Sequence, residues 1–237
     1  MFHYLLTPLD QHFDLGFGAV ADSFKEAADT VLAAPSNRRG LNEHLPGSFL
    51  YRHAIELYLK SGIIIFHRRL ELPYGEEPAE SEPRVKVGSE WKLMYRVHSL
   101  VELYQYYRTL FSDHAEYLRS CTKTNWSFPP ELDAWVEEIE SRDSTSTFFR
   151  YPVTKHRERD PEKSLMKENN YQNIIAKMGP GRRYVRAYVV TNPDGEIIRA
   201  FEQDDEVAQL TLRTLSQASQ VFHDCHAAMR AEFTGGW

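Results

Sequence analysis

One long segment, residues 47–72, constrains the fold more than any other part of the chain. Its sequence is apolar on nearly every side of a helix, apart from one charged stripe formed by Arg52, Glu56 and Lys60. A helix that is apolar almost all round is buried in the middle of a bundle. The segment therefore predicts a central helix with other helices packed around it.

Apolar residues at helical spacing predict four further helices. One of them begins with a capping box, because Ser99 can accept a hydrogen bond from the amide three residues on and Glu102 can reach back. Another follows Pro129-Pro130, and the last begins with Asp204 and Asp205, acids at the positive end of its dipole. The predicted helices, besides the central one, cover residues 17–34, 99–118, a stretch from 130 past 139, and a stretch from 204 past 229.

A β-hairpin is predicted before the last helix. Residues 184–190 are rich in β-branched and aromatic side chains, residues 192–195 read Asn-Pro-Asp-Gly, a type I turn, and residues 196–201 return. Proline, glycine and glutamate predict a solvated loop at 73–90. We therefore predict a mainly α protein: an antiparallel helical bundle forming a single domain over 1–237, with a basic loop and the hairpin inserted at about 150–202.

Several classes of protein are excluded or disfavoured by what the chain contains. Its two cysteines suggest neither a disulfide framework nor a metal pattern, and no motif for a nucleotide cofactor is present, so no cofactor is expected. The N-terminus does not resemble a signal peptide, and the longest apolar run, 62–66, is too short to span a bilayer. These features predict a cytoplasmic protein without a membrane partner.

Charge is distributed unevenly along the chain. The net charge is −6, but residues 150–186 hold ten Lys or Arg against four acids, which makes this basic segment +6 and the remainder −12. An acidic body with one basic segment argues against a protein that coats nucleic acid generally. It leaves that segment as a candidate for phosphate contacts.

The charged stripe on the central helix has two interpretations. Arg52, Glu56 and Lys60 are four residues apart and share a face, so they can form two ion pairs on a solvated strip, each worth about 0.3–0.5 kcal/mol. Alternatively the stripe lines a polar groove, in which Arg52 or Lys60 holds a phosphate and His53 transfers protons. An unpaired buried charge would be very costly, so partners from another helix are expected if the stripe is buried.

Two more segments could carry chemistry. His98 lies just before the Ser99 cap, where it either packs as part of the cap or meets an anion at the helix N-terminus. Arg150 and Tyr151 precede Pro152, which disfavours helix at Tyr151 and predicts an extended stretch. Phe148 and Phe149 can return to the core beside them, with Arg150 bonding loop carbonyls.

The order of these segments resembles the bacterial HEPN family. The resemblance rests on Tyr51-Arg-His-Ala-Ile-Glu-Leu-Tyr-Leu-Lys60, then His98-Ser-Leu, then Asp143, then Phe149-Arg-Tyr-Pro152. It covers roughly residues 15 to 152. It implies a helical bundle that often forms homodimers, in a family with many members in toxin–antitoxin and other antiviral systems.

The resemblance also implies an activity and a candidate site. Active HEPN proteins are metal-independent ribonucleases whose signature is an Arg followed a few residues later by a His. Arg150 and His156, with five residues between them, have this spacing and become the candidate catalytic pair. The usual polar residue after the Arg is replaced by Tyr151, and Pro152 interrupts the helix on which the signature usually lies. Candidate binding residues are Arg52, His53, Glu56, Lys60, His98 and Tyr151.

Three functions remain open at this point. The first is an RNA- or nucleotide-binding protein of bacterial defence or stress response that can act as a ribonuclease, with the basic segment on phosphates and tyrosines stacked on bases. The second is a non-catalytic module that binds a partner protein in a toxin–antitoxin or defence pair. The third is a structural protein whose charged stripe is solvated.

Overall fold

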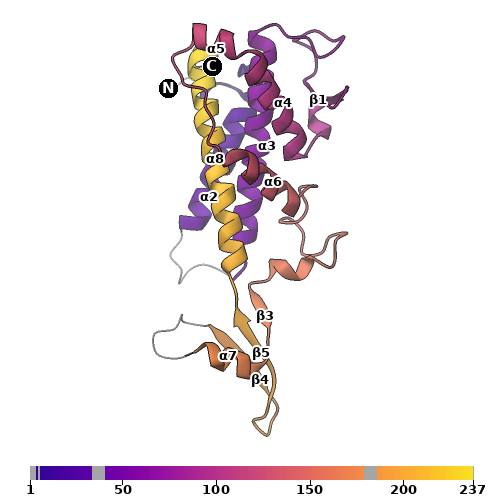
Figure 1. Cartoon of the computed structure of the whole chain (residues 1–237), viewed down its shortest axis with the longest axis vertical. Coiled ribbons are helices and arrows are strands. Elements are labelled where there is room, and N and C mark those ends of the chain that lie inside the picture. The colour runs from indigo at the N-terminus through magenta and orange to yellow at the C-terminus, as the bar shows by residue number, and fades with distance from the viewer. Residues whose placement is uncertain (1–3, 5, 34–40, 179–185, 237) are drawn as a thin grey trace.

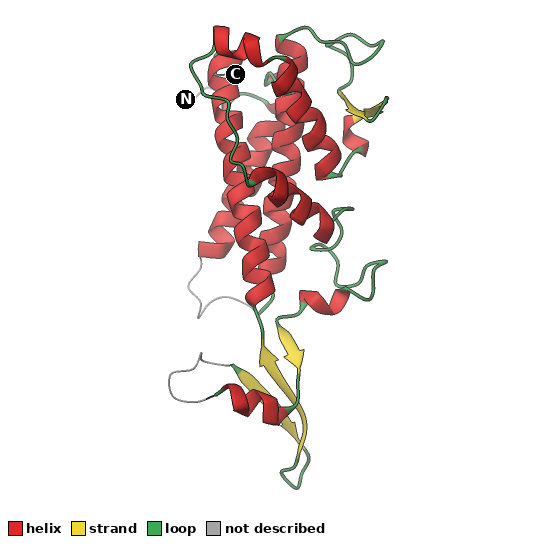
Figure 2. Ribbon diagram, in the orientation of Figure 1, coloured by secondary structure: helices red, strands yellow, loops and turns green. Residues whose placement is uncertain are grey.

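The computed structural model describes residues 4, 6–33, 41–178 and 186–236, and these form a helical bundle with a small β-sheet at one end (Figures 1 and 2). The mainly α prediction, with strands inserted before the last helix, is confirmed. The seven α-helices of the described residues are α2 (Phe17–Ala33), α3 (His44–Arg69), α4 (Leu100–Asp113), α5 (Ala115–Cys121), α6 (Leu132–Arg142), α7 (Tyr171–Lys177) and α8 (Glu206–Phe233). None of the described helices is both long and apolar enough to cross a membrane.

Helix α3 is the centre of the bundle and contacts α2, α4 and α8. Most of its residues are buried, including Ile55, Leu59 and Ile63, as its apolar girth predicts. Gly62 allows α4 to approach closely, because a Cβ at this position would lie 2.4 Å from the ring of Tyr107. The two longest helices, α3 and α8, therefore form the spine on which the other helices pack.

The inserted sheet has the strand order β3-β5-β4 and extends beyond one end of the bundle, with α7 beside it (Figure 1). Its strands are β3 (Met166–Glu168), β4 (Ala187–Thr191) and β5 (Ile197–Gln203), and both neighbouring pairs are antiparallel. The predicted turn is present, since the Gly195 amide donates to the Asn192 carbonyl over 3.0 Å and Gly195 has φ +84°. Strand β3 and helix α7 were not predicted, because each is short and lies in a polar stretch.

Residues 73–90 were predicted to be a loop, and part of that prediction is wrong. Strands β1 (Arg84–Val87) and β2 (Glu90–Leu93) form an antiparallel hairpin that turns at Gly88, which has φ +60°. Val85 is fully buried and joins the core. A strand of four residues with one buried side chain gives too short a pattern to be recognised in a sequence where the surrounding prolines and glutamates indicate a loop.

The predicted helix 99–118 is divided in two at His114. This residue leaves the helical conformation between α4 and α5, and its ring stacks on Phe66 of α3 at a centroid distance of 6.1 Å. Periodicity does not report such a tertiary contact. Short 3-10 helices complete the described elements at Leu9–Gln11, Met94–Arg96 and Asp160–Lys163.

Candidate functional site

The charged stripe of α3 is buried rather than solvated. The exposed fraction is 0% for Arg52, 2% for Glu56 and 3% for Lys60. The predicted pairs at four-residue spacing are present, since Arg52 Nη1 and Lys60 Nζ each lie 2.8 Å from a different oxygen of Glu56. Of the two interpretations, the solvated strip is therefore wrong, and the pairs lie in a low-dielectric interior where losing one partner is costly.

Arg52 ties three elements together. Its Nη2 donates to the carbonyl of His98 over 2.6 Å, just before α4, and its Nε lies 3.3 Å from the carbonyl of Asp143, just after α6. The Asp143 carboxylate, also buried, lies 3.6 Å from the same Nε. We call Arg52, Glu56, Lys60, His98 and Asp143 the polar seam. Arg52 and Lys60 have their charges neutralised within it, so neither presents a free charge to a phosphate.

Asp143 also shapes the segment that carries Arg150. One carboxylate oxygen accepts the amides of Thr147 and Phe148, at 2.7 and 2.9 Å. The amides of Arg150 and Tyr151 then bond back to the Thr147 carbonyl at 3.2 and 3.1 Å. The stretch is thus a tight turn, which corrects the extended conformation predicted from Pro152. Sequence reasoning had singled out Asp143 in the motif without foreseeing that its carboxylate would organise this turn.

His98 is the member of the polar seam that reaches solvent. Its Nδ1 lies 3.0 Å from Glu56 Oε1, while 53% of its side chain is exposed. Burial opposes ionisation of Glu56, but the charges of Lys60 and Arg52 and the hydrogen bonds from Lys60 and His98 outweigh it and hold the pKa of Glu56 below its ordinary value. An ionised Glu56 can only accept, so the Nδ1 of His98 carries the proton. The lone pair of a neutral His98 is therefore on Nε2.

The start of α4 does not offer a vacant anion site. Glu140 of α6 accepts the Leu100 amide at 2.8 Å, and Ser99 accepts the Glu102 amide at 3.2 Å as the predicted N-cap. A carboxylate of the protein itself thus occupies the positive end of the helix. The structure therefore does not support the alternative in which an external anion binds the first amides of α4 beside His98.

His53 and Arg150 flank the same aromatic ring. The His53 ring stacks on Phe49 at 5.7 Å and meets Phe24 of α2 edge-on at 4.5 Å. The guanidinium of Arg150 lies 5.7 Å from the Phe49 centroid and 5.3 Å from that of Tyr151. Burial lowers the pKa of His53, and the positive charges of Lys60, Arg52 and Arg150 lower it further against the opposing effect of Glu56.

The Arg150 and His156 side chains are both exposed. His156 Nδ1 lies 3.6 Å from Glu158, and no hydrogen bond or ion pair joins it to Arg150 in the part of the chain that is described. Tyr151 is 52% exposed beside Arg150. Phe149 enters the core as predicted, while Arg150 lies on aromatic rings instead of bonding loop carbonyls.

The basic segment is only partly available to a ligand. Lys163 is buried and pairs with Asp160 at 2.6 Å, and Lys177 pairs with Glu202 at 2.6 Å. Lys155 and Arg157 are exposed and form no ion pair with the described residues. Arg182 and Arg183 lie outside the described residues. Among the described residues, exposed basic side chains of this segment therefore lie both close to Arg150 and at Arg186, just before β4.

A second polar cluster, which sequence reasoning missed, lies on the opposite face of α3. Ser61 donates to Asp14 over 2.5 Å, and His226 Nδ1 lies 3.0 Å from the Ser61 oxygen. His226 Nε2 lies 3.3 Å from the Tyr4 hydroxyl. We call Tyr4, Asp14, Ser61 and His226 the Ser61 cluster. The signal available in the sequence was the pair His223 and His226 on one helix, but nothing there pointed to Asp14.

No three His, Cys, Asp or Glu side chains are grouped as metal ligands among the residues that the structure describes. Comparison with known proteins gives no further guidance about the site. No protein-family model matches the chain, and it has no match among curated proteins or solved structures. The function is therefore argued from the geometry of the polar seam and its surroundings.

Proposed function

We propose that this chain is an RNA-directed protein of the HEPN type, in bacterial defence or stress response, and that it cleaves RNA through the imidazole of His98 without a metal ion. The observation that carries the proposal is the contact between His98 Nδ1 and the buried Glu56 carboxylate. A carboxylate behind an imidazole fixes its tautomer and stabilises the imidazolium that forms on proton uptake. The Nε2 of this half-exposed ring is then the general base.

The proposed reaction uses the RNA 2′-hydroxyl as nucleophile. His98 Nε2 takes the hydroxyl proton while the 2′-oxygen bonds to phosphorus, the bond from phosphorus to the 5′-oxygen breaks, and that oxygen leaves with a proton from water. The products are a 2′,3′-cyclic phosphate and a 5′-hydroxyl, and the imidazolium returns its proton to solvent. Arg150 is exposed and forms no ion pair with the described residues, so it is the candidate that stabilises negative charge on the phosphate, with Tyr151 beside it to stack on a base.

This proposal moves the proton-transfer role from His156 to His98. His156 has a surface glutamate, Glu158, as its partner, and 70% of the Glu158 side chain is exposed. Glu56, by contrast, is buried and fixed by two cations. A fixed carboxylate holds an imidazole in one orientation better than a mobile surface carboxylate does, which favours His98 for proton transfer.

The test is RNA cleavage in chelator by wild type, His98→Ala, His156→Ala and Arg150→Ala. Removing a general base costs about 10²–10⁴-fold in rate. We expect that loss for His98→Ala, a partial loss for Arg150→Ala and little change for His156→Ala, with thermal melting showing that all variants fold. Full activity of His98→Ala would overturn the proposal. Loss of activity confined to Arg150→Ala and His156→Ala would identify Arg150 and His156 as the catalytic pair instead.

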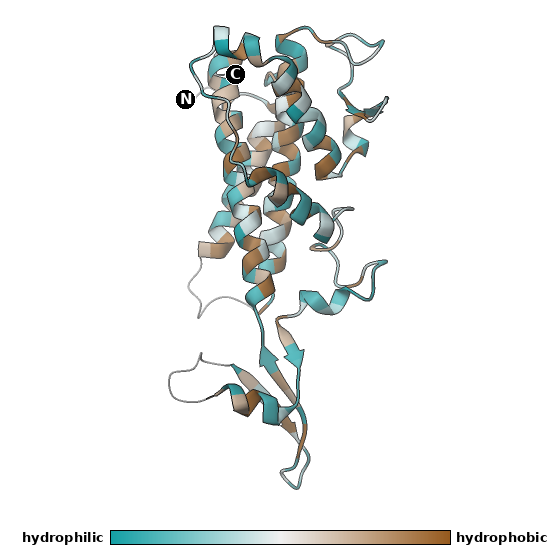
Figure 3. Cartoon of the chain, viewed as in Figure 1, coloured by the Kyte–Doolittle hydropathy of each residue, from teal (hydrophilic) through white to brown (hydrophobic). Residues whose placement is uncertain are grey.

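A second candidate function, a non-catalytic protein-interaction module, is supported by the inserted sheet. All five residues of β4 are exposed, and Tyr188, Val189, Ile197 and Ile198 place exposed apolar side chains on the two faces of the β4–β5 hairpin, whose ribbon is coloured by hydropathy in Figure 3. β4 is an edge strand of the described sheet and has neither lysine nor proline to protect it. Antiparallel pairing of two copies about Val189 would place only uncharged side chains opposite one another, so the occupant that fits is a second copy of this chain.

The oligomeric state tests this candidate. Val189→Lys on the β4 edge should convert a dimer into a monomer in light scattering. Ile198→Lys places the same charge on the central strand β5 and leaves the edge intact, so it should disturb the dimer less. A monomeric wild type would remove the homodimer from consideration.

A further inference from the structure

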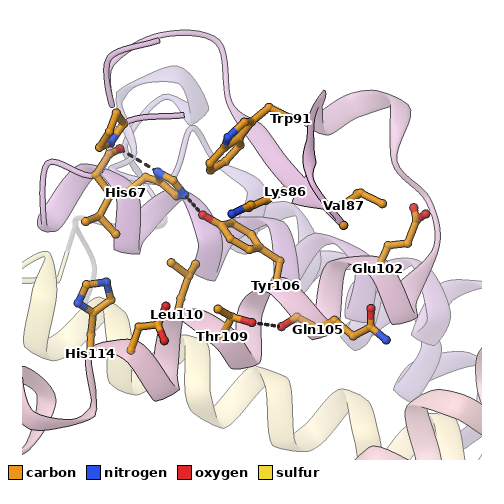
Figure 4. A pocket seen from close by; sticks show the side chains of 14 residues that line it. His67, Lys86, Val87, Trp91, Glu102, Gln105, Tyr106, Thr109, Leu110 and His114 are labelled. Atoms are coloured by element: carbon orange, nitrogen blue, oxygen red, sulfur yellow. Dashed lines mark hydrogen bonds between the residues drawn. The ribbon is translucent and has the colours of Figure 1, made fainter. Parts of the chain in front are cut away.

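A pocket of about 490 Å³ lies between the β1–β2 hairpin, the end of α3 and one face of α4 (Figure 4). Pockets of this volume hold small molecules in many proteins. None of its lining residues belongs to the polar seam, so it is a separate feature from the proposed RNA site.

One wall of the pocket is a rigid set of aromatic rings. Trp91 of β2 meets Tyr106 of α4 edge-on at 5.6 Å and Tyr74 edge-on at 6.0 Å. Gly75 allows this packing, because a Cβ there would lie 2.7 Å from the indole. Trp91 and Tyr106 both line the pocket, so a ligand meets ring surfaces that are already fixed in place.

The pocket lining near α3 is uncharged. His67 is buried, its Nδ1 lies 2.8 Å from the Leu72 carbonyl and its Nε2 lies 2.9 Å from the Tyr106 hydroxyl (Figure 4). Since a carbonyl only accepts, Nδ1 holds the proton and the Tyr106 hydroxyl donates to Nε2. Burial lowers the pKa of His67 to about 4, so the ring stays neutral near pH 7. A neutral His67 therefore cannot form an ion pair with an anion that enters the pocket.

On the α4 side of the pocket the Tyr106 and Thr109 hydroxyls act as acceptors, and the Gln105 side-chain amide can both donate and accept. The Tyr106 hydroxyl hydrogen is used on His67, and the Thr109 hydroxyl donates to the Gln105 carbonyl at 2.9 Å. Their oxygens keep lone pairs. Two carboxylates, Glu102 and Asp113, line the same helix face, against one ammonium, Lys86, on the hairpin. A ligand that supplies donors and positive charge complements this lining better than a phosphate does.

We propose that this pocket binds a small organic cation, an ammonium or guanidinium group on a slender aliphatic body. The charged group pairs with Asp113, which is exposed and makes no ion pair with the described residues. Glu102 is less available, because it lies 3.8 Å from the Lys92 ammonium. The aliphatic part lies against Trp91 and Tyr106, where burial of its apolar surface adds to the contact.

The test is calorimetric titration of the protein with agmatine and with spermidine, and AMP serves as an anionic probe. Losing a charge-assisted hydrogen bond weakens binding by about tenfold to a hundredfold. We expect that loss for Asp113→Asn. Asp224→Asn removes the same charge from an exposed site on α8 and should bind as wild type does.

Three outcomes would overturn the proposal. They are no binding of either cation to wild type, equal binding to wild type and Asp113→Asn, and tighter binding of AMP than of both cations. Because the pocket and the polar seam share no residue, Asp113→Asn should leave RNA cleavage unchanged. A failure here therefore does not count against the proposed function.

Discussion

The two polar clusters on opposite faces of α3 have similar residue types and different exposure. In the Ser61 cluster each histidine nitrogen has a partner inside the protein, and the Tyr4, Ser61 and His226 side chains are buried. In the polar seam, His98 has one nitrogen on a buried carboxylate and a ring that is half exposed. A closed network stabilises a fold, whereas an open one can also act on a ligand.

The hydrogen-bond directions make this difference explicit. Ser61 gives its hydrogen to Asp14, so the Ser61 oxygen accepts from His226 Nδ1, and Nε2 in turn accepts from Tyr4. The Asp14 carboxylate also accepts hydrogen bonds from the amides of Gly16 and Gly18, at 3.0 and 2.7 Å. No lone pair on the His226 ring is left for a substrate. The Ser61 cluster is therefore assigned to stability.

Removing Arg52 should have the largest effect on stability. Arg52→Ala leaves the Glu56 and Asp143 carboxylates buried with less compensation, which costs about 3–5 kcal/mol of unfolding free energy. Urea denaturation measures it. The matched control is Lys25→Ala, which breaks an ion pair of the same spacing with Asp29 near the surface and should cost about 0.5 kcal/mol or less. Equal losses for the two variants would contradict the buried seam.

The next effect is the pH dependence of stability contributed by the Ser61 cluster. Burial lowers the pKa of His226 below 6.5, against the opposing charges of Asp14 and Asp22. At a pH between the folded and unfolded pKa values of His226, the unfolded chain binds more protons than the folded chain does. The contribution of His226 to stability is therefore fully present above pH 6.5 and is lost as the pH falls below that value. Each unit of depression contributes about 1.4 kcal/mol. His226→Gln should lose less stability than wild type from pH 7 to 5, and parallel curves would argue against a buried neutral ring.

Ser61→Ala should cost somewhat less. It leaves Asp14 and His226 without their shared partner, and an unsatisfied buried group costs about 1–3 kcal/mol. Ser23→Ala removes an exposed hydroxyl whose one hydrogen bond to the described residues is to the Ala19 carbonyl of its own helix, so it should change the unfolding free energy little. A Ser61→Ala protein as stable as Ser23→Ala would show that the cluster is not tightly closed.

The smallest expected effect is on RNA binding. Arg150→Ala should reduce the slope of log affinity against log salt by about 1, because one phosphate contact is lost. Arg213→Ala removes the same charge from an exposed position of α8, outside the basic segment, and serves as the control. An unchanged slope for Arg150→Ala would remove this residue from the phosphate contacts.

The sequence predicted the bundle and its central helix because both depend on periodic burial, which single residues report directly. It brought Arg52, Glu56 and His98 into consideration through their motif, yet it left open whether the α3 stripe was solvated. That question depends on Asp143, ninety-one positions from Arg52, and on the backbone of His98. Long-range pairing of this kind leaves no periodic signal.

The misses have the same physical origin. The β1–β2 hairpin depends on one buried valine and one glycine turn, and the Ser61 cluster depends on residues from opposite ends of the chain. The pocket beside Trp91 likewise needs α3, α4 and the hairpin together. Each feature is formed by tertiary contacts among residues that look ordinary in their local sequence.

The most direct test of the central claim is a crossed measurement on His98→Ala and Ser61→Ala, with RNA cleavage in chelator and urea stability recorded for both. We predict that His98→Ala loses cleavage by about a hundredfold or more and keeps its stability, because the ring is half exposed. Ser61→Ala should lose stability and keep its cleavage rate per folded molecule. Loss of cleavage in Ser61→Ala with full cleavage by His98→Ala would contradict the account and place the chemistry on the other face of α3.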